Sequence, residues 1–275
     1  MNKPNSSTST EPNDFRVMRD VSYLTEDRSE KADFYLPPAI PDGKRVPAVV
    51  VIHGGGFRTL AKDNPREVNI CGNLARNGYI AMSIDYALAA EGKPAWPRNL
   101  HDCKTAVRWL RANAERLQID PDRIGVIGGS AGGTLASLVA MTLPSDGLDP
   151  VASHGDLSCA VRCAVDLYGV SDIAKWNEDT VLFNKTFAEA PELYRQASPI
   201  TYVRPGGVPQ LIIHGTADET VDVSQSEDFA QALDQAGSPN ELILVPGAVH
   251  SFHLEPEQRD LRPAVLGFLD RHLKA

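Results

Sequence analysis

An alternation of short, mostly apolar runs with segments of helical periodicity constrains the fold more than any other feature of the sequence. The run at residues 47–52 is uninterrupted, and mostly apolar runs cover residues 79–84, 124–127, 160–167, 210–213 and 241–245. Runs without polar interruptions are typical of strands that are buried on both faces of a parallel sheet. Residues 17–24 and 32–36 predict an antiparallel pair of strands at the start of the chain.

Amphipathic helices are predicted between these strands. In residues 100–117 the apolar side chains recur every three or four positions, which places them on one helical face. Residues 223–236 and 261–273 show the same pattern, and residues 134–140 are also helix-like. Strands that alternate with helices predict an α/β fold, in which helices flank a doubly wound, mostly parallel sheet.

Length and composition predict one domain. The chain has 275 residues, of which 42% are hydrophobic, and this is enough for one large core. We therefore expect a single α/β domain over residues 15–275. Residues 1–14 are polar and rich in Ser, Thr, Pro and Asn, so they predict a disordered tail.

Charge and hydropathy narrow the class of partners and the location. The formal charge of −9 disfavours nucleic acids and anionic membranes, because both bind basic surfaces. No run reaches the ~18 apolar residues of a membrane span, and the first residues lack the apolar core of a signal peptide. We expect a cytoplasmic protein, although the sequence leaves open a leader that was removed. It does not define the oligomeric state.

One segment breaks the alternation of strands and helices. Residues 170–207 separate two predicted strands by more residues than a single helix needs. Long excursions in compact α/β domains are usually functional, so we expect a lid-like insertion; the alternative is an extra helix that covers the sheet. The substrate-lining side chains expected from position and apolarity are Phe57, Trp176, Phe183 and Phe187, with a place in the core as the alternative.

The pentapeptide 128–132 has the form G-x-S-x-G and lies between a predicted strand and a predicted helix. Such a pentapeptide is expected roughly 0.1 times by chance in a chain of this length, and a chance copy would rarely fall on a strand-to-helix turn. In this setting the serine is held on a tight turn with its hydroxyl exposed. The motif therefore indicates Ser130 as a nucleophile.

A nucleophilic serine needs a base and a group that orients the base. Functional groups of open α/β sheets gather beyond the carboxyl ends of the strands. Asp218 and His250 both follow predicted strands, and the order Ser, Asp, His is one that hydrolytic triads use. The alternatives are His253 for the base, and Glu219 or Asp222 for the acid. The remaining candidates are interpreted as structural or exposed: Asp166, His101, His154, His214 and His272.

A glycine-rich loop follows the strand at 47–52. His53 is followed by three glycines, so backbone N–H groups can point at one spot. Attack on an ester carbonyl creates an oxyanion, and preorganised donors stabilise it. We expect the N–H groups of Gly55, Gly56 and Ala131 to be these donors, and His53 to support the loop. The alternative is a phosphate-binding loop, but neither G-x-x-x-x-G-K-[ST] nor G-x-G-x-x-G is present there.

The cysteines do not indicate a metal site. Cys71, Cys103, Cys159 and Cys163 form no C-x-x-C pair and have no zinc-like spacing to histidines. We interpret all four as buried free thiols, with a Cys159–Cys163 disulfide as the alternative. No metal ion and no organic cofactor is expected.

Together the motifs at 53–56, 128–132, 214–218 and 250 resemble those of the hormone-sensitive-lipase-like carboxylesterases of the α/β-hydrolase superfamily. The segments 85–89, 96–97 and 102–110 are also similar to that group, and the resemblance covers residues 33–273. Two features depart from it: Gly129 replaces the usual acidic residue before the serine, and a large N-terminal helical cap is absent. Both departures, and the segment 197–203, resemble the compact feruloyl- and acetyl-xylan-esterase-like branch.

The resemblance implies a serine carboxylesterase that hydrolyses short-chain acyl or carbohydrate-linked esters through an acyl-enzyme. Its expected partner is a small-molecule or carbohydrate ester. An amidase or peptidase, such as a formamidase, and a lipase use the same triad and remain alternatives. A binding protein on an inactive hydrolase scaffold is the alternative outside enzymes. The absent cap disfavours long-chain lipids.

Overall fold

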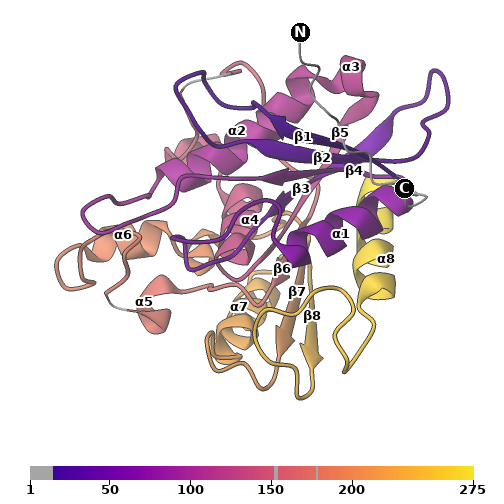
Figure 1. The fold of residues 1–275 in the computed structure, drawn as a ribbon. Coiled ribbons are helices and arrows are strands. Elements are labelled where there is room, and N and C mark those ends of the chain that lie inside the picture. The colour runs from indigo at the N-terminus through magenta and orange to yellow at the C-terminus, as the bar shows by residue number, and fades with distance from the viewer. Residues whose placement is uncertain (1–14, 152–153, 178) are drawn as a thin grey trace, which may run out of the picture.

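The computed structural model describes residues 15–151, 154–177 and 179–275. The tail predicted for residues 1–14 lies outside these ranges. The described chain contains one central sheet of eight strands (Figure 1). From edge to edge its order is β1 (Arg16–Val21), β2 (Ala32–Leu36), β4 (Ile80–Ile84), β3 (Val46–Ile52), β5 (Ile119–Gly129), β6 (Ala164–Leu167), β7 (Gln210–Gly215) and β8 (Asn240–Val245).

The predicted α/β fold with a mostly parallel sheet is confirmed. Strands β1 and β2 are antiparallel to each other, and β2 is antiparallel to β4. The pairs from β4 through β3 and β5 to β8 are parallel. The predicted antiparallel pair at the start of the chain is therefore confirmed as well, and it forms one edge of the sheet.

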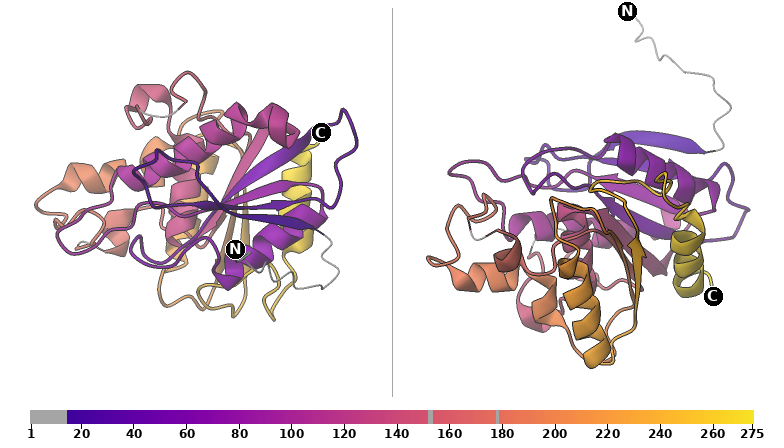
Figure 2. Two further views of the ribbon diagram at one scale, coloured as in Figure 1. Left: turned by 45° about the horizontal axis from the view of Figure 1, so that its top comes forward. Right: turned by 90° about the horizontal axis from the view of Figure 1, so that it is seen from below.

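Helices cover both faces of this sheet (Figures 1 and 2). The helices α2 (Arg98–Ala112), α4 (Ala131–Met141) and α7 (Ser224–Gln235) contribute to the core on one face. The helices α1 (Pro65–Arg76) and α8 (Arg262–Leu273) contribute to the core on the other face. Two cores that share one sheet are what a doubly wound arrangement requires.

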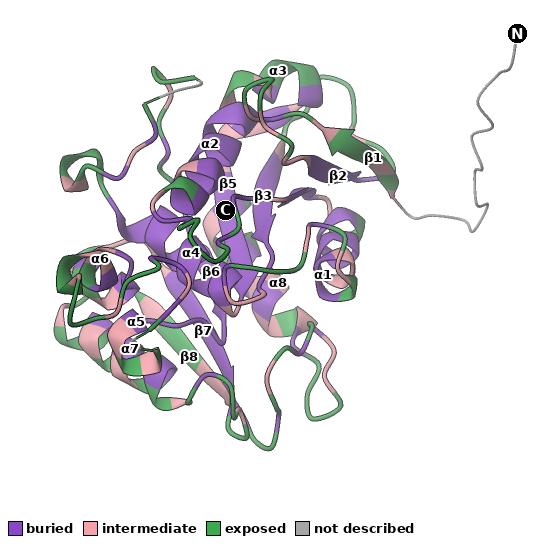
Figure 3. Cartoon of the chain, turned by 60° about the vertical axis from the view of Figure 1, so that its left-hand side comes forward, coloured by how far each residue is buried: buried purple, intermediate pink, exposed green. Residues whose placement is uncertain are grey.

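Strand β3 shows why its sequence is an uninterrupted apolar run. Val50 and Ile52 belong to the core beneath α2 and α4, while Val49 and Val51 belong to the core beneath α1 and α8. All four side chains are fully buried, as the burial colouring of the central strands shows (Figure 3). Successive side chains of a strand point to opposite faces, so both kinds of position must be apolar here.

Three expectations about the elements need correction. Strand β6 begins at Ala164 instead of residue 160, and Arg162, inside the expected strand, is exposed. The helix expected over residues 100–117 is divided at Asn113 into α2 and α3 (Ala114–Leu117). Helix α1 was not predicted. Its buried face includes the polar side chains of Arg66, Glu67 and Asn73, and these interrupt the apolar pattern.

The described part of residues 170–207 (170–177 and 179–207) forms no single long helix. It contains the short helices α5 (Ile173–Trp176) and α6 (Pro191–Gln196) and the 3₁₀ helix η2 (Pro199–Tyr202). A further 3₁₀ helix, η1 (Pro144–Asp146), follows α4. Helices α5 and α6 lie to one side of the sheet (Figure 1), and the role of this segment as a lid stays a prediction. Within the described ranges, no helix is both long enough and apolar enough to span a bilayer.

Candidate active site

Ser130 stands alone between strand β5, which ends at Gly129, and helix α4, which begins at Ala131. Its backbone has φ of 57° and ψ of −126°, a conformation that L-residues rarely adopt and that is found where function requires strain. The turn also requires glycine on both sides. A Cβ atom at Gly128 would lie 2.2 Å from the carbonyl oxygen of Gly132, and one at Gly132 would lie 2.1 Å from that of Ile52.

The structure brings the three residues proposed from sequence into one hydrogen-bonded chain. The Nε2 atom of His250 lies 3.0 Å from Oγ of Ser130, and its Nδ1 atom lies 2.6 Å from Oδ2 of Asp218. A carboxylate can only accept, so Nδ1 carries the proton and Nε2 is left to accept from the serine hydroxyl. Asp218 follows β7 and His250 follows β8, so parallel pairing carries both to one edge of the sheet.

The carboxylate of Asp218 is held ionised. Its side chain is fully buried, and burial alone would raise its pKa. Hydrogen bonds from His214, from His250 and from the backbone N–H groups of Val221 and Thr220 outweigh burial, and the pKa of Asp218 lies well below its usual value. A carboxylate that stays charged can orient the imidazole and stabilise its protonated form.

The alternatives to Asp218 and His250 are exposed, and the contacts of two of them are with nearby backbone N–H groups. His253 is exposed, and its Nδ1 atom accepts from the backbone N–H of Glu255 at 2.9 Å. Glu219 is exposed as well. Asp222 is exposed and accepts from the backbone N–H of Ser224, the first residue of α7.

Asp218 has one contact that the sequence analysis missed, the contact with His214. We interpreted His214 as structural or exposed, and the structure buries it completely with Nε2 3.2 Å from Oδ2 of Asp218. Its position four residues before Asp218, at the end of β7, is the one sequence signal that points to this contact. Asp166 is buried and accepts from the N–H of Gly169 and the hydroxyl of Ser137, in agreement with a structural role.

The glycine-rich loop lies beside the nucleophile. A Cβ atom at Gly54 would lie 2.8 Å from the carbonyl oxygen of Gly129 and 3.1 Å from Cβ of Ser130. Gly55 has φ of +99°, and a Cβ there would lie 2.1 Å from the carbonyl oxygen of Thr59. Only glycine fits such a close approach of backbone to backbone.

The three N–H groups expected to bind an oxyanion are available. Gly55 and Gly56 donate through their N–H groups to no acceptor in the described part of the chain. Ala131 is the first residue of α4, and the first N–H groups of a helix have no acceptor within it. His53 is buried, and burial lowers its pKa to about 4. It is therefore uncharged at neutral pH and contacts the loop through the carbonyl oxygen of Gly54, 2.8 Å from Nδ1.

A cavity of about 450 Å³ borders this loop. Gly55, Gly56 and Trp176 are among its lining residues, and Thr220 from the loop of Asp218 lines it too. The indole Nε1 of Trp176 donates to the carbonyl oxygen of Thr220 at 3.1 Å. Helix α5 is thereby tied to the loop that carries the acid.

The four aromatic residues expected to line the acyl pocket lie in three different environments. Trp176 lines the cavity just described. Phe57 and Phe183 are buried in the core, where Phe57 packs edge-on against Trp176 with ring centroids 6.4 Å apart. Phe187 is partly exposed and packs against Tyr194. The apolar character of Phe57, Phe183 and Phe187 is explained by packing. Sequence position alone could not distinguish packing from contact with substrate.

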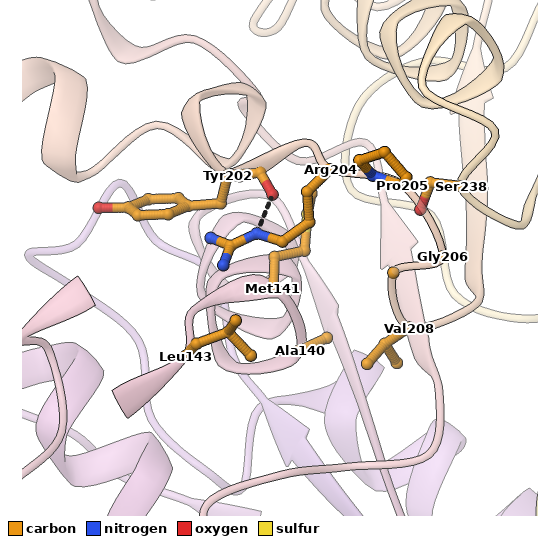
Figure 4. A pocket seen from close by; sticks show the side chains of 10 residues that line it. Ala140, Met141, Leu143, Tyr202, Arg204, Pro205, Gly206, Val208 and Ser238 are labelled. Carbon is orange, nitrogen blue, oxygen red and sulfur yellow. Dashed lines mark hydrogen bonds between the residues drawn. The ribbon is translucent and has the colours of Figure 1, made fainter. Parts of the chain in front are cut away.

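A second pocket, of about 250 Å³, lies at the other end of α4 (Figure 4). Met141, the last residue of α4, lines it together with Tyr202 and Arg204. A helix rises about 1.5 Å per residue, so the length of α4 separates this pocket from Ser130 at its start.

The described residues contain no group of three or more His, Cys, Asp or Glu side chains suited to hold a metal ion. The interpretation of the cysteines as buried free thiols is confirmed, and Cys159 and Cys163 form no disulfide. The four free, buried thiols are those of Cys71, Cys103, Cys159 and Cys163.

Comparison with known proteins finds relatives that are named as esterases or ester hydrolases. Esterase LipQ of Mycobacterium tuberculosis is 30% identical over 262 residues, which are 91% of this chain and 61% of that protein. Ethyl acetate hydrolase of Pseudomonas putida is 30% identical over 85% of this chain and 74% of its own length. The chain spans about three fifths of the length of three mycobacterial relatives that it matches.

The solved structure of Thermogutta terrifontis esterase 2 phosphorylated by paraoxon is 26% identical, covers 95% of this chain and 95% of its own, and superposes with a TM-score of 0.77. A family model described as BD-FAE matches residues 32–233. This span carries Ser130, the glycine-rich loop and Asp218, and it covers more than half of the sequence. The chain therefore belongs to the BD-FAE family and has the α/β-hydrolase fold.

Proposed function

We propose that the protein is a serine carboxylesterase that hydrolyses esters through an acyl-enzyme. The observation that carries this proposal is the chain of contacts from Ser130 to His250 and on to Asp218, with distances of 3.0 and 2.6 Å. Unrelated hydrolases share this geometry, because a serine hydroxyl becomes nucleophilic when a base takes its proton. The esterase names of the relatives support the same reaction class.

In the proposed reaction, Oγ of Ser130 attacks the ester carbonyl carbon while Nε2 of His250 takes the hydroxyl proton. The carbonyl oxygen becomes an oxyanion, which the N–H groups of Gly55, Gly56 and Ala131 bind. Asp218 stabilises the imidazolium that forms. The imidazolium then gives its proton to the leaving alcohol as the carbon–oxygen bond breaks.

The acyl group is then released from Ser130 by the same steps in reverse order. Water takes the place of the alcohol, His250 removes a proton from it, and the hydroxide attacks the acyl carbonyl. The ester bond to Ser130 breaks, its oxygen recovers the proton from His250, and the carboxylic acid leaves. These steps need neither a metal ion nor an organic cofactor.

We propose short acyl chains as the substrate class. The cavity beside the glycine-rich loop has a volume of about 450 Å³, which is in the range of small-ligand pockets. A relative named ethyl acetate hydrolase, 30% identical to this chain, favours small esters. Carbohydrate-linked esters are the second substrate class that we propose, on the sequence resemblance alone.

The test is hydrolysis of p-nitrophenyl acetate by the wild type and by Ser130→Ala. We expect turnover to fall about 10⁴-fold or more in the variant. Ser145→Ala is the matched control, because Ser145 is exposed in η1 beyond the far end of α4. Equal hydrolysis by the wild type and Ser130→Ala would exclude the mechanism. If the protein hydrolysed amides as fast as esters, the proposed function would change from carboxylesterase to amidase.

A further inference from the structure

A buried arginine from helix α1 lies against both the glycine-rich loop and the nucleophile turn. A Cβ atom at Gly54 would lie 2.9 Å from Nη2 of Arg66, and one at Gly129 would lie 2.9 Å from its Cζ. The side chain of Arg66 is only 6% exposed. Its guanidinium therefore fills the space that these two glycines leave open, between the glycine-rich loop and the nucleophile turn.

The charge of Arg66 is paired inside the protein. Its Nε donates to Oε1 of Glu67 at 2.7 Å, and Nη2 lies 2.6 Å from the same oxygen. Glu67 is fully buried, and its other oxygen accepts from Asn64 at 3.1 Å. A buried charge is costly unless it is paired and hydrogen-bonded. The ion pair with Glu67 therefore holds the guanidinium in place, and the net charge of the two side chains together is close to zero.

Tyr168, which follows β6, connects Arg66 to the loop of the histidine. Its hydroxyl accepts from Nη1 of Arg66 at 3.3 Å and donates to the carbonyl oxygen of Phe252. Its ring packs edge-on against His250, with centroids 4.9 Å apart and planes at 64°. Burial raises the pKa of Tyr168 to about 12, so its hydroxyl keeps the proton that it donates.

We propose that Arg66 and Tyr168 are positioning residues, which brace the glycine-rich loop, the nucleophile turn and the histidine loop as one rigid unit. The inference rests on the proposed function and adds residues that do not touch the reacting atoms. Misplacement of catalytic groups by about 1 Å can cost 10²-fold in rate. A brace of this kind contributes to kcat, because it fixes the geometry of the imidazole and of the oxyanion donors.

The first experiment is Tyr168→Phe, which keeps the ring against His250 and removes only the hydroxyl. For p-nitrophenyl acetate we expect kcat to fall by roughly 10- to 100-fold, while KM stays within about twofold. Tyr202→Phe is the matched control, because its hydroxyl also donates to a backbone carbonyl, that of Gln196 at 2.8 Å. We expect the control to keep wild-type kcat and KM.

A spectroscopic readout separates positioning from general packing. The Nδ1 proton of His250, held 2.6 Å from Asp218, should give a low-field proton resonance in the wild type. We expect this resonance to broaden or vanish in Tyr168→Phe and to persist in Tyr202→Phe at a temperature where both proteins are folded. A resonance that is unchanged in Tyr168→Phe, together with unchanged kcat, would overturn the proposal.

A second variant covers the case in which Tyr168→Phe does not fold. Arg66→Lys keeps a positive charge beside Glu67, but one ammonium group cannot hold Glu67 and Tyr168 in the geometry of the planar fork. We expect it to lower kcat as Tyr168→Phe does. The double variant should be little worse than either single one, because both break the same link. Fully additive losses would show two independent packing effects and would contradict the brace.

The outcomes separate this inference from the proposed function. If Ser130→Ala abolishes hydrolysis and both brace variants keep wild-type kcat and the low-field resonance, the brace is excluded and the esterase proposal stands. If hydrolysis does not depend on Ser130, the esterase proposal fails. The resonance of His250 in the two brace variants then still decides whether Arg66 and Tyr168 position the imidazole.

Discussion

The Nε2 atom of His214 lies 3.2 Å from Oδ2 of Asp218, the carboxylate oxygen that His250 also contacts. His214 has a second contact on the same nitrogen, with the carbonyl oxygen of Val221 at 2.9 Å, and its Nδ1 lies 2.7 Å from the hydroxyl of Ser226. Two acceptors at Nε2 indicate that this nitrogen carries the proton. His214 therefore helps to hold the acid of the proposed triad from behind.

Replacement of this histidine should weaken both the fold and catalysis. In His214→Ala the buried partners of the imidazole lose their hydrogen bonds, so we expect the free energy of unfolding to fall by about 1–3 kcal/mol. With Asp218 less firmly held, kcat should fall about tenfold. Denaturant unfolding and steady-state kinetics measure the two effects. His253→Ala, in an exposed loop, is the control, and equal behaviour of the two variants would contradict this role.

The pH dependence of hydrolysis should reflect one group on the acidic side. The proposed mechanism needs His250 as a proton acceptor, so kcat/KM should be lower in acid than at neutral pH. Protonation of Asp218 should cause no further fall of kcat/KM in this range, because hydrogen bonds hold the pKa of Asp218 well below its usual value despite its burial. Measurements of kcat/KM from pH 5 to pH 9 test this expectation. A flat profile would count against His250 as the base.

Asp166 should make stability depend on pH in the opposite sense to a salt-bridged carboxylate. Burial raises its pKa from the ordinary 3.8 to about 6, so the folded state holds the proton more tightly than the unfolded state does. This contribution to stability is fully present below about pH 4 and is lost as the pH rises through about 6. Two pKa units correspond to roughly 3 kcal/mol.

Asp166→Asn isolates this effect, because its amide oxygen can still accept from the N–H of Gly169 and its amide N–H can donate to the hydroxyl oxygen of Ser137. We expect the variant to gain roughly 3 kcal/mol of unfolding free energy relative to the wild type between pH 4 and pH 7. Urea unfolding of both proteins at several pH values provides the measurement. A difference that stays constant over this range would show that Asp166 does not titrate there.

Trp176 should influence which acyl chains are accepted. It lines the cavity beside Gly55 and Gly56, so Trp176→Ala should enlarge the space next to the proposed oxyanion donors. We expect kcat/KM to shift toward longer acyl chains across a series of p-nitrophenyl esters. Leu143→Ala, an exposed apolar residue beyond the far end of α4, serves as the control. An unchanged chain-length profile in Trp176→Ala would remove this residue from the substrate site.

Local patterns explain why much of the fold could be predicted. An uninterrupted apolar run such as 47–52 reports burial on both faces of a strand, and the structure has Val49 and Val50 in opposite cores. Glycine is required at positions 128 and 132 because a Cβ atom there would lie only 2.2 and 2.1 Å from a backbone carbonyl oxygen. Helix α1 escaped prediction because Arg66 and Glu67, two charged side chains, are buried in it, and no local pattern reveals that they pair inside the protein.

The sequence by itself determined the α/β architecture and the positions of Ser130, Asp218 and His250 after strands, because strand burial and tight turns depend on neighbouring residues. Only the tertiary structure decided which side chains meet: that His214 contacts Asp218, that Tyr168 links Arg66 to the histidine loop, and that the core takes up Phe57. The contact between Arg66 and Tyr168, for example, joins residues that are 102 positions apart. Such contacts depend on strand order and loop packing, which the arrangement of the whole sheet sets.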